Sequence, residues 1–438
     1  MENIDTLIEA RYVVPVEPHG TVLTDHAVAV KDGRIVALLP AALAAERYAA
    51  AETVRHPDAV LIPGLVNAHT HAAMTLLRGY ADDLPLMTWL AEHIWPAEAR
   101  HVSAGFVEDG TRLAAAEMLR GGVTCMNDMY FFPEASASAA QSLGMRAALG
   151  MIAIEFPTAY ASDADDYLAK GLAFRDAHRH DPLLSFCLAP HAPYTVGDKT
   201  FEKIARYAAE LGVPVHVHLH ETADEVAQSL KDHGVRPLAR LHRLGLIGPQ
   251  TIAVHAVHLE DAEIELMARE GVSVAHCPAS NLKLASGIAP VARLADAGVN
   301  LAIGTDGAAS NNRLDMFAEM RLAALLAKGA SGRAEVLPAA SALRAATLGG
   351  ARALGLEATI GSIVAGKCAD LAAVSLARTD LNPVYDPVSH LVYVAERTDV
   401  AQVWVAGRSV ARKQRLTHAA DSDLDSLARL WQNRLRAE

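Results

Sequence analysis

Two histidines, His69 and His71, lie two residues apart in the segment NAHTH. Side chains two positions apart on a β-strand point to the same face, so both imidazoles would project from one side of such a strand. Two imidazoles on one face are suited to bind a single divalent metal ion such as zinc. Two polar residues at a strand end give the same pattern, so the pair alone does not establish a metal site.

A second group of polar residues occurs in VPVHVHLHE, which contains His216, His218, His220 and Glu221. The three histidines share one parity, so spacing alone does not identify which of them binds the metal. A carboxylate directly after a ligand-bearing strand can transfer protons without binding the metal, and this is the role we expect for Glu221. A solvated glutamate at the start of a helix is the simpler alternative.

Three further candidates end later segments of the same kind. His255 in TIAVHAV is suited to be a metal ligand, a polarising group or a structural histidine, and His258 three residues later is a weaker candidate. Asp306 in LAIGTD is expected as a fourth ligand, although an aspartate among small residues is also typical of a turn. His191 lies in LAPHAPY. No lysine ends a predicted strand to bridge a second metal, so we expect one metal.

Three histidines and one aspartate around a metal leave room for a water molecule. A zinc ion lowers the pKa of its bound water to about 7, so that hydroxide is available at neutral pH. Proton transfer by Glu221 would add roughly 10²–10⁴-fold to the rate. These residues indicate hydrolysis at an electrophilic carbon and leave the substrate open.

The elements that would position these residues alternate between strand and helix from about Pro63 to Gly350. Amphipathic segments such as KTFEKIARYAAELG separate eight strand-like segments. The eight are LIPGLVNAHTH, VTCMNDM, RAALGMIAI, LLSFCLAPH, VPVHVHLHE, TIAVHAV, VSVAHCP and NLAIGTD. Eight βα units predict an α/β fold, a (β/α)8 TIM-like barrel with its active site at the carboxyl ends of the strands. The segment ADDLPLMTWLAEHIWPAEARH is long enough to cover the mouth of this barrel.

Both ends of the chain are rich in short strand-like segments, in contrast to the alternating strands and helices of the middle. HAVAVKDGRIVALL contains Asp32 and Gly33 as a hairpin turn, and GSIVAGKCADLAAVSL and VAQVWVAGRSV repeat this texture near the other end. We expect residues 1–62 and 359–438 to form one small composite β-sandwich, with the barrel at 63–358. The final DSDLDSLARLWQNRLRAE carries leucines at helical spacing and predicts a terminal helix.

The composition limits the partners and the cellular compartment that we expect for this protein. A formal net charge of -12 and a pI of about 5.9 argue against nucleic-acid or anionic-membrane partners, because phosphates repel an acidic protein. The four cysteines form no C-x-x-C pair, which is consistent with a reducing compartment. The first residues lack the pattern of a signal peptide, and no segment approaches the roughly 18 apolar residues of a membrane span. We expect a cytoplasmic protein.

Seven segments together resemble the amidohydrolase superfamily, and within it the branch of 5-methylthioadenosine/S-adenosylhomocysteine deaminases that also holds triazine hydrolases. They cover nearly the whole chain: PGLVNAHTHAAMTLLRGYADDLPLMTWL, GGVTCMNDMYF, APHAPYTV, HLHET, VHAVHL, HCPASNLKLASGIAP and GTDGAASNNRLDMF. The resemblance implies a zinc-dependent barrel with a composite β-sandwich. It also implies one zinc ion per subunit, or another divalent metal such as Fe²⁺, and a homodimer or tetramer.

The resemblance also implies roles for individual residues. His69 and His71 match the metal ligands of the first strand, and the H-x-x-E pattern selects His218 as a ligand and Glu221 as proton shuttle and substrate contact. Asp306 matches a metal ligand that also takes a proton from the attacking water.

Three more residues match positions around the substrate. His255 matches a histidine near the metal-bound water and the leaving group. Glu98 matches an acid that binds the ribose hydroxyls, and His191 matches a histidine that contacts the substrate. His276 lies in the matching segment HCPASN without an assigned role.

These roles predict hydrolytic deamination of an adenine nucleoside by a zinc-bound hydroxide. The substrate would be 5′-methylthioadenosine, adenosine or S-adenosylhomocysteine. Some relatives place an arginine about where Met151 falls, so we expect a neutral tail to be preferred. The first alternative is a zinc hydrolase of another aminated or chlorinated ring, such as a triazine, guanine or cytosine. The second is a metal-free barrel with an assembly or regulatory role, which should have lost ligands that this chain retains.

Overall fold

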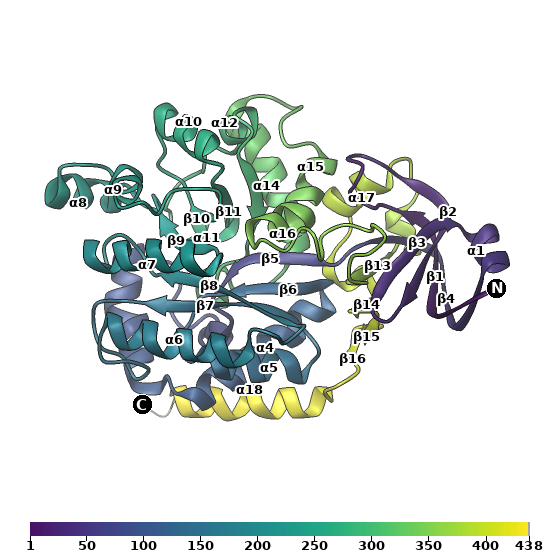
Figure 1. Cartoon of the computed structure of the whole chain (residues 1–438), viewed down its shortest axis with the longest axis horizontal. Helices are drawn as coiled ribbons and strands as arrows, with labels where there is room; N and C mark the ends of the chain where they lie inside the picture. The colour runs from purple at the N-terminus through teal and green to yellow at the C-terminus, as the bar shows by residue number, and fades with distance from the viewer. Residues whose placement is uncertain (437–438) are drawn as a thin grey trace.

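The computed structural model describes residues 1–436 of the 438-residue chain, and its centre is a parallel barrel (Figure 1). Eight strands follow one another around this barrel in chain order. They are β5 (Leu65–Thr70), β6 (Val123–Asp128), β7 (Arg146–Ala153), β8 (Leu184–Pro190), β9 (Val215–Leu219), β10 (Thr251–His255), β11 (Ser273–His276) and β12 (Asn300–Ile303). All eight predicted strands are present, and the predicted barrel is confirmed.

The barrel closes where the last strand returns to the first. The backbone N–H of Asp306 donates to the carbonyl oxygen of His69 at 3.0 Å, and Asn67 bonds both the backbone N–H and the hydroxyl of Thr305. A Cβ at Gly304 would lie 2.8 Å from the backbone nitrogen of His69, so only glycine permits this approach. Closure brings the ends of β5 and β12 together.

Helices cover the outside of the barrel, because their apolar faces pack on the strands. In α7, for example, Phe201, Ile204 and Ala208 are buried at helical spacing. These helices include α4 (Ala104–Arg120), α5 (Pro133–Ser142), α6 (Ala164–His178), α7 (Asp198–Leu211), α8 (Ala223–His233), α9 (Pro237–Arg243), α10 (Asp261–Glu270), α12 (Val291–Asp296), α14 (Met316–Ser331), α15 (Ala339–Arg344), η3 (Ala345–Gly349) and α16 (Gly350–Ala353). Two short helices, α11 (Pro278–Lys283) and α13 (Ala308–Asn311), lie instead at the carboxyl ends of the strands.

Short helices between β5 and α4 cover the mouth of the barrel, as the length of this segment predicted. They are η1 (Ala72–Leu77), α2 (Leu86–Thr88), η2 (Trp89–Ile94) and α3 (Trp95–His101). The turn η2 is a π-helix, a form that occurs often at functional sites. Trp89, Leu90 and Ile94 point from it into the central cavity.

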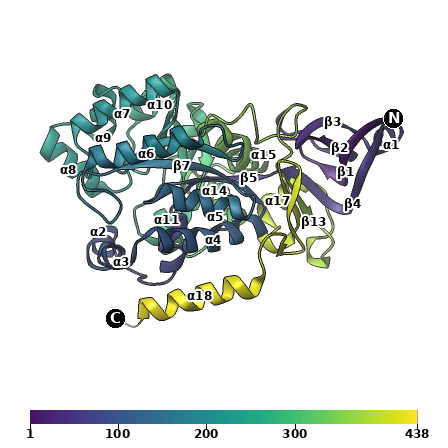
Figure 2. The ribbon, with the colours of Figure 1, turned by 60° about the horizontal axis from the view of Figure 1, so that its bottom comes forward.

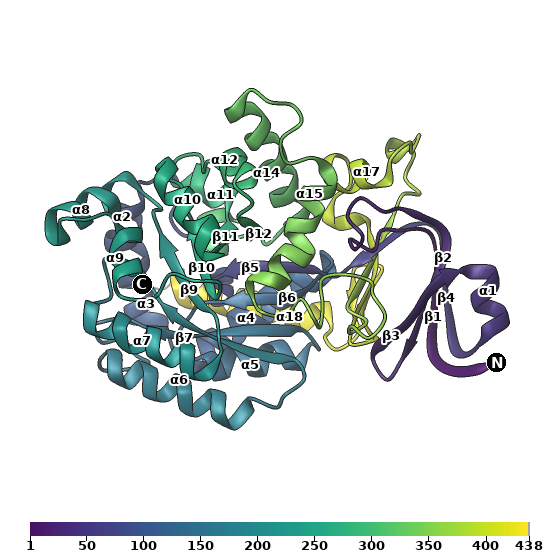
Figure 3. The same ribbon diagram turned by 45° about the horizontal axis from the view of Figure 1, so that its top comes forward.

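The two ends of the chain form one separate mixed sheet beside the barrel (Figure 3). Its strand order is β16-β15-β14-β13-β4-β1-β2-β3. The strands are β1 (Glu2–Val13), β2 (Leu23–Lys31), β3 (Arg34–Pro40), β4 (Tyr48–Pro63), β13 (Leu371–Ser375), β14 (Val400–Val405), β15 (Arg408–Arg412) and β16 (Arg415–Leu416). The helices α1 (Ala41–Arg47), η4 (Thr379–Leu381), α17 (Pro387–Tyr393) and η5 (Arg397–Asp399) connect its strands. The predicted boundaries at 62/63 and 358/359 stay predictions.

The hairpin between β2 and β3 turns at Asp32 and Gly33, as predicted. Both residues have positive φ angles, 51° and 74°, and Lys31 pairs with Arg34 across the turn. This backbone matches the right-handed twist of an antiparallel pair.

A buried ion pair joins the barrel to the mixed sheet. The Arg146 Nε atom on β7 donates to the Asp370 Oδ2 atom at 2.9 Å, and Nη2 donates to Oδ1 at 3.2 Å. Both side chains are 5% exposed or less. Asp370 also accepts the backbone N–H of Ala406 in the mixed sheet.

The chain continues into α18 (Asp421–Arg436), which confirms the predicted terminal helix as far as residue 436 (Figure 2). The last two residues of that prediction lie outside the described residues. This helix lies along α4, where Trp431 packs edge-on against Phe106 at 5.2 Å and its Nε1 donates to Asp109. Leu424 and Trp431 are its buried residues. Among residues 1–436, no helix has the length and apolar character needed to cross a membrane.

Candidate active site and metal centre

A cavity of about 330 Å³ lies at the carboxyl ends of the barrel strands. Polar residues of several strands project into it, and the short helices at the mouth form its roof. Its polar wall contains His71, Glu98, Tyr130, His191, His218, Glu221, His255 and Asp306. Its apolar wall contains Met74, Leu86, Trp89, Leu90, Ile94, Trp95, Val102, Met129, Phe131, Ile152, Ile154, Phe156 and Leu284.

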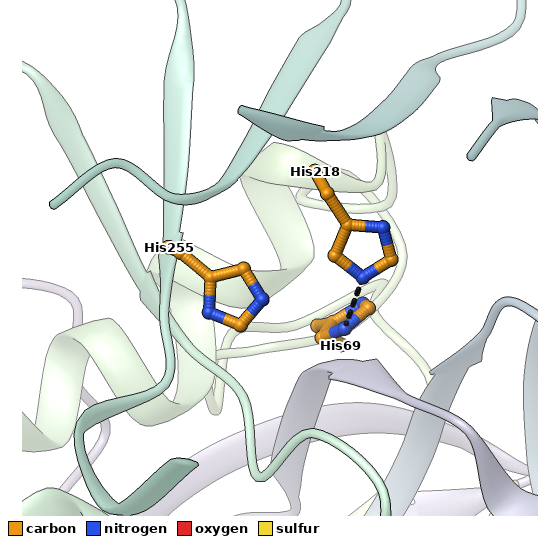
Figure 4. Close-up of side chains that lie close together, drawn as sticks. All are labelled: His69, His218 and His255. Carbon is orange, nitrogen blue, oxygen red and sulfur yellow. Dashed lines mark hydrogen bonds between the residues drawn. The ribbon is translucent and has the colours of Figure 1, made fainter. Parts of the chain in front are cut away.

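Four of the predicted site residues converge on one point beneath this cavity. The Nε2 atoms of His69 and His218 are 3.3 Å apart, and Figure 4 shows the two rings edge to face beside His255. The Asp306 Oδ1 atom lies 3.4 Å from His69 Nε2 and 3.3 Å from His71 Nε2. His69, His218 and His255 form one group of metal-ligating atoms within 4.8 Å, and His69, His71 and Asp306 form another.

Hydrogen bonds fix the orientation of two of these rings. The Nδ1 atom of His71 lies 2.6 Å from the carbonyl oxygen of Met129, and Nδ1 of His218 lies 2.8 Å from that of His191. A carbonyl only accepts, so in each neutral ring Nδ1 carries the proton and Nε2 keeps its lone pair. A partner of this kind is typical of metal-binding histidines.

The other two rings are also held at Nδ1. His69 Nδ1 lies 2.9 Å from Nε2 of His216, which is buried deeper in the barrel. His255 Nδ1 lies 2.8 Å from Oδ1 of Asn281. In both residues Nε2 is the nitrogen that faces the cluster, so His255 is suited to bind a metal or to accept a proton.

Asp306 is held in a strained backbone conformation. Its φ angle is 60°, a region that L-residues other than glycine rarely adopt. The hydroxyl of Ser280 donates to Oδ2 at 2.6 Å, and the backbone N–H of Gly307 donates to Oδ1. Burial raises the pKa of this carboxyl, but the hydrogen bond and charge of His69 outweigh burial and hold the pKa well below its usual range. Asp306 is therefore a carboxylate at neutral pH.

The chemistry of these donors fits a divalent metal ion. Burial lowers the pKa of His69 to about 4 and the pKa of His218 well below its usual range, so both imidazoles are neutral at pH 7. Neutral imidazoles and one carboxylate are the ligands that zinc takes in catalytic sites. The assignment of His69, His71, His218 and Asp306 as ligands stays a prediction, which this geometry supports.

Glu221 faces the cavity next to this cluster. It follows β9, is 5% exposed, and its Oε2 atom lies 3.8 Å from His255 Nε2. Burial raises the pKa of its carboxyl above the ordinary value. A raised pKa favours the protonated form of this carboxyl group, which suits Glu221 to act as a general acid.

His220, between His218 and Glu221 in the pattern, points away from the site. Its φ angle is 57°, so the chain turns at this residue, and its ring bonds the backbone of Leu238 and His258 instead. A residue other than glycine in this left-handed backbone conformation lowers the stability of the fold by roughly 1–3 kcal/mol. Parity alone, which places all three histidines on one face, therefore fails at His220.

Glu98 lies in α3, above the cluster, and is half-buried. The Tyr130 hydroxyl donates to its Oε1 atom at 2.6 Å, which leaves Oε2 for a ligand in the cavity. Removal from water raises the pKa of Glu98 to about 7, and the bond from Tyr130 opposes this rise.

The expectation that Met151 stands at the position that selects the substrate tail is wrong. Along β7, side chains alternate between the cavity and the helix layer, and Met151 faces the helices: a Cβ at Gly171 of α6 would lie 2.8 Å from the Cβ of Met151. Ile152 and Ile154 line the cavity instead. His276 is buried outside the cavity wall, and neither ring nitrogen has a hydrogen-bond partner among residues 1–436.

Several residues that orient the site residues could not be identified from the sequence. Tyr130, Ser280 and Asn281 orient Glu98, Asp306 and His255, yet each comes from a different segment than the residue it holds. No spacing rule connects such pairs. The signal available was their position directly after a predicted strand, where loop residues reach the barrel mouth.

A parallel (β/α)8 barrel with imidazoles and a carboxylate at its mouth defines the class of metal-dependent barrel hydrolases. The chain belongs to the amidohydrolase family, whose model matches residues 60–410.

Named relatives cover the whole chain. It is 48% identical over 436 residues to a 5-methylthioadenosine/S-adenosylhomocysteine deaminase of Teredinibacter turnerae, covering 100% of this chain and 99% of that protein. A solved adenosine deaminase from Xanthomonas campestris with bound zinc is 56% identical and covers 100% of both chains, with a TM-score of 0.99. A zinc complex of an atrazine chlorohydrolase from Arthrobacter aurescens is 25% identical over 97% of this chain and 99% of its own, with a TM-score of 0.90.

Proposed function

We propose that this protein is a zinc-dependent aminohydrolase that deaminates an adenine nucleoside to the inosine-type product and ammonia. The substrate is 5′-methylthioadenosine, adenosine or S-adenosylhomocysteine. One observation carries this proposal: a cluster suited to one metal lies beside Glu221, with Glu98 in the same cavity. The names of the relatives support the same reaction.

His69, His71, His218 and Asp306 would hold one zinc ion, which supplies Lewis acidity that activates a water molecule when bound. The Asp306 carboxylate takes a proton from the attacking water. Glu221 protonates the ring nitrogen next to C6, so that electron density moves into the ring as the C–O bond forms. His255, held at Nδ1 by Asn281, would contact the water and the leaving group. Asp306 then gives its proton to the amino nitrogen, and Glu221 takes the proton of the new C6 hydroxyl group as the C6–N bond breaks. Ammonia leaves and a carbonyl group remains at C6.

Glu98 would bind the ribose. A carboxylate accepts hydrogen bonds from hydroxyl groups, and its Oε2 atom is the one left by Tyr130. The apolar walls suit the base and a non-polar tail, because burial removes their apolar surface from water.

We propose that a neutral 5′ tail is preferred over an amino-acid tail. Within residues 1–436 no lysine or arginine lines the cavity, and its charged groups include the acids Glu98, Glu221 and Asp306. No lysine or arginine of residues 1–436 is therefore available in the cavity to pair with the carboxylate of S-adenosylhomocysteine, and the ionised Asp306 repels it. Equal turnover of S-adenosylhomocysteine and 5′-methylthioadenosine would contradict this preference.

A hydrolase of another ring is the second candidate, because triazine and guanine hydrolases share the fold. Glu98 favours a substrate with hydroxyl groups, since a triazine would leave its Oε2 atom without a hydrogen-bond donor.

An ultraviolet assay for adenine-to-hypoxanthine conversion tests the proposal. The purified protein, loaded with zinc, is given 5′-methylthioadenosine, adenosine, S-adenosylhomocysteine, guanine and a triazine, with and without chelator. We expect turnover of a nucleoside, and loss of that turnover when chelator removes the metal. Inert nucleosides in a metal-replete sample would refute the proposal.

We further propose a cytoplasmic homodimer or homotetramer without nucleic-acid or membrane partners. The net charge of -12 supports the last point. Light scattering of the purified chain measures its oligomeric state.

A further inference from the structure

The backbone between β9 and α8 makes a sharp turn between a predicted metal ligand and the predicted proton donor. His218 lies in β9, His220 adopts a left-handed conformation, and Glu221 then enters the cavity. The geometry of this turn decides where the carboxyl group of Glu221 lies. Something must hold it, because a left-handed histidine is unfavourable by itself.

Glu225 reaches back to this turn from the first turn of α8. Its Oε1 atom accepts the backbone N–H of His220 at 2.9 Å, and its Oε2 atom accepts that of Glu221 at 2.7 Å. Both oxygens of one buried carboxyl group are thus bonded to consecutive amides. Glu225 is only 6% exposed, so water does not compete for these two hydrogen bonds.

This contact differs from an ordinary helix cap. Thr222 caps α8, and its hydroxyl accepts the backbone N–H of Glu225 at 3.2 Å. In a capping box the glutamate three residues after the cap bonds the N–H of the cap residue itself. Here Glu225 bonds the two preceding residues, so the bond serves the segment that carries Glu221 and not the helix end.

The rest of the turn is anchored to the outer layer. The carbonyl oxygen of His220 accepts the backbone N–H of Val257 and of His258, both at 3.0 Å. Its ring bonds Leu238 and His258. These contacts fix the position of His220. The hydrogen bond from the Glu221 N–H to Glu225 then sets the direction in which Glu221 leaves the turn.

We propose that Glu225 is a positioning residue for Glu221 in the deamination reaction. It acts by binding the backbone and not by touching substrate, and the inference rests on the proposed role of Glu221. Replacement of the acid by an amide brings an NH₂ group against one of the two N–H donors. That N–H group loses its acceptor, and the turn that carries Glu221 loses one of the two bonds that hold it.

The test uses the zinc-loaded full chain and four variants: Glu225→Gln, Glu221→Gln, their double variant, and Asp315→Asn. Asp315 is a control for the change of a buried acid to an amide, because it is also 6% exposed. Its Oδ1 atom accepts both backbone N–H groups at the start of α14, and asparagine retains this oxygen. We expect Glu225→Gln to lower kcat by about 10- to 100-fold. KM and zinc content should change little, and Asp315→Asn should retain kcat.

The double variant separates positioning from a general structural role. If Glu225 acts through Glu221, adding Glu225→Gln to Glu221→Gln lowers kcat no further. A structural role lowers kcat by the same factor in both backgrounds. Should Glu225→Gln not fold, Glu225→Asp replaces it, with a shorter side chain that reaches one N–H and a smaller expected loss.

The outcomes also distinguish the two proposals. Wild-type kcat in Glu225→Gln or in folded Glu225→Asp, or a full additional loss in the double variant, overturns the positioning role. A wild-type enzyme without turnover of any nucleoside overturns the proposed function instead, as the substrate assay measures directly.

Discussion

At the scale of single residues, the site combines groups whose environments push their protonation in opposite directions. Asp306 stays ionised among the histidines, whereas burial raises the pKa of Glu221 and of Glu98. Such pairs separate the proton acceptor from the proton donor within one cavity. Two predictions follow from individual side chains.

The first concerns Glu221. Glu221→Gln removes the acidic proton and leaves the size of the side chain unchanged, so we expect kcat to fall by roughly 10²–10⁴-fold. Zinc content, measured by elemental analysis, should stay at the wild-type level. Loss of zinc together with activity would identify Glu221 as a metal ligand instead.

The second concerns the pH dependence of substrate binding. Glu98 accepts ribose hydroxyl bonds when ionised, and its pKa of about 7 means that it gains a proton as the pH falls below 7. We expect KM for the nucleoside to rise from pH 8 to pH 6, and this rise to disappear in Glu98→Gln. Tyr130→Phe removes a bond that lowers this pKa, so its KM should begin to rise at a higher pH. An unchanged profile in both variants would contradict the role of Glu98.

At the scale of elements, the sequence was a good guide to strands and a poor guide to the turns that follow them. Most barrel strands are buried along their whole length and rich in apolar residues, which makes them recognisable in the sequence. The turn at His220 depends on Glu225 and on contacts with other segments, so local spacing could not reveal it. The face of Met151 needed the register of β7, which an ungapped comparison of letters does not supply.

The terminal helix offers a test at this scale. Trp431→Ala removes the larger of the two buried side chains of α18 together with its bond to Asp109. We expect amide protons of α18 to exchange faster with deuterium, while kcat changes by less than about twofold because the helix lies outside the barrel wall. Leu430→Ala is the control, since Leu430 is 44% exposed. Equal protection of α18 in both variants would show that Trp431 does not hold this helix.

At the scale of the whole molecule, the barrel and the mixed sheet share the buried pair of Arg146 and Asp370. Asp370→Asn leaves a buried guanidinium without its counter-charge, which lowers the free energy of unfolding by roughly 3–5 kcal/mol. Urea denaturation measures this change. The exposed pair of Arg333 and Asp296 is the control, and Asp296→Asn should leave the urea midpoint close to that of the wild type. Similar losses in both variants would argue against a special role for the buried pair.

The order of strands in the mixed sheet has a consequence for how the chain is made. Residues Ala59–Pro63 of β4, all apolar and buried, pair on one side with β13, which begins only at Leu371. A ribosome adding 5–20 residues per second needs roughly 15 to 60 s to synthesise the intervening segment. During that time the nascent chain presents an unpaired apolar strand edge, which is a template for association with other chains. Translation speed and chaperone supply should therefore govern the yield of this protein in cells.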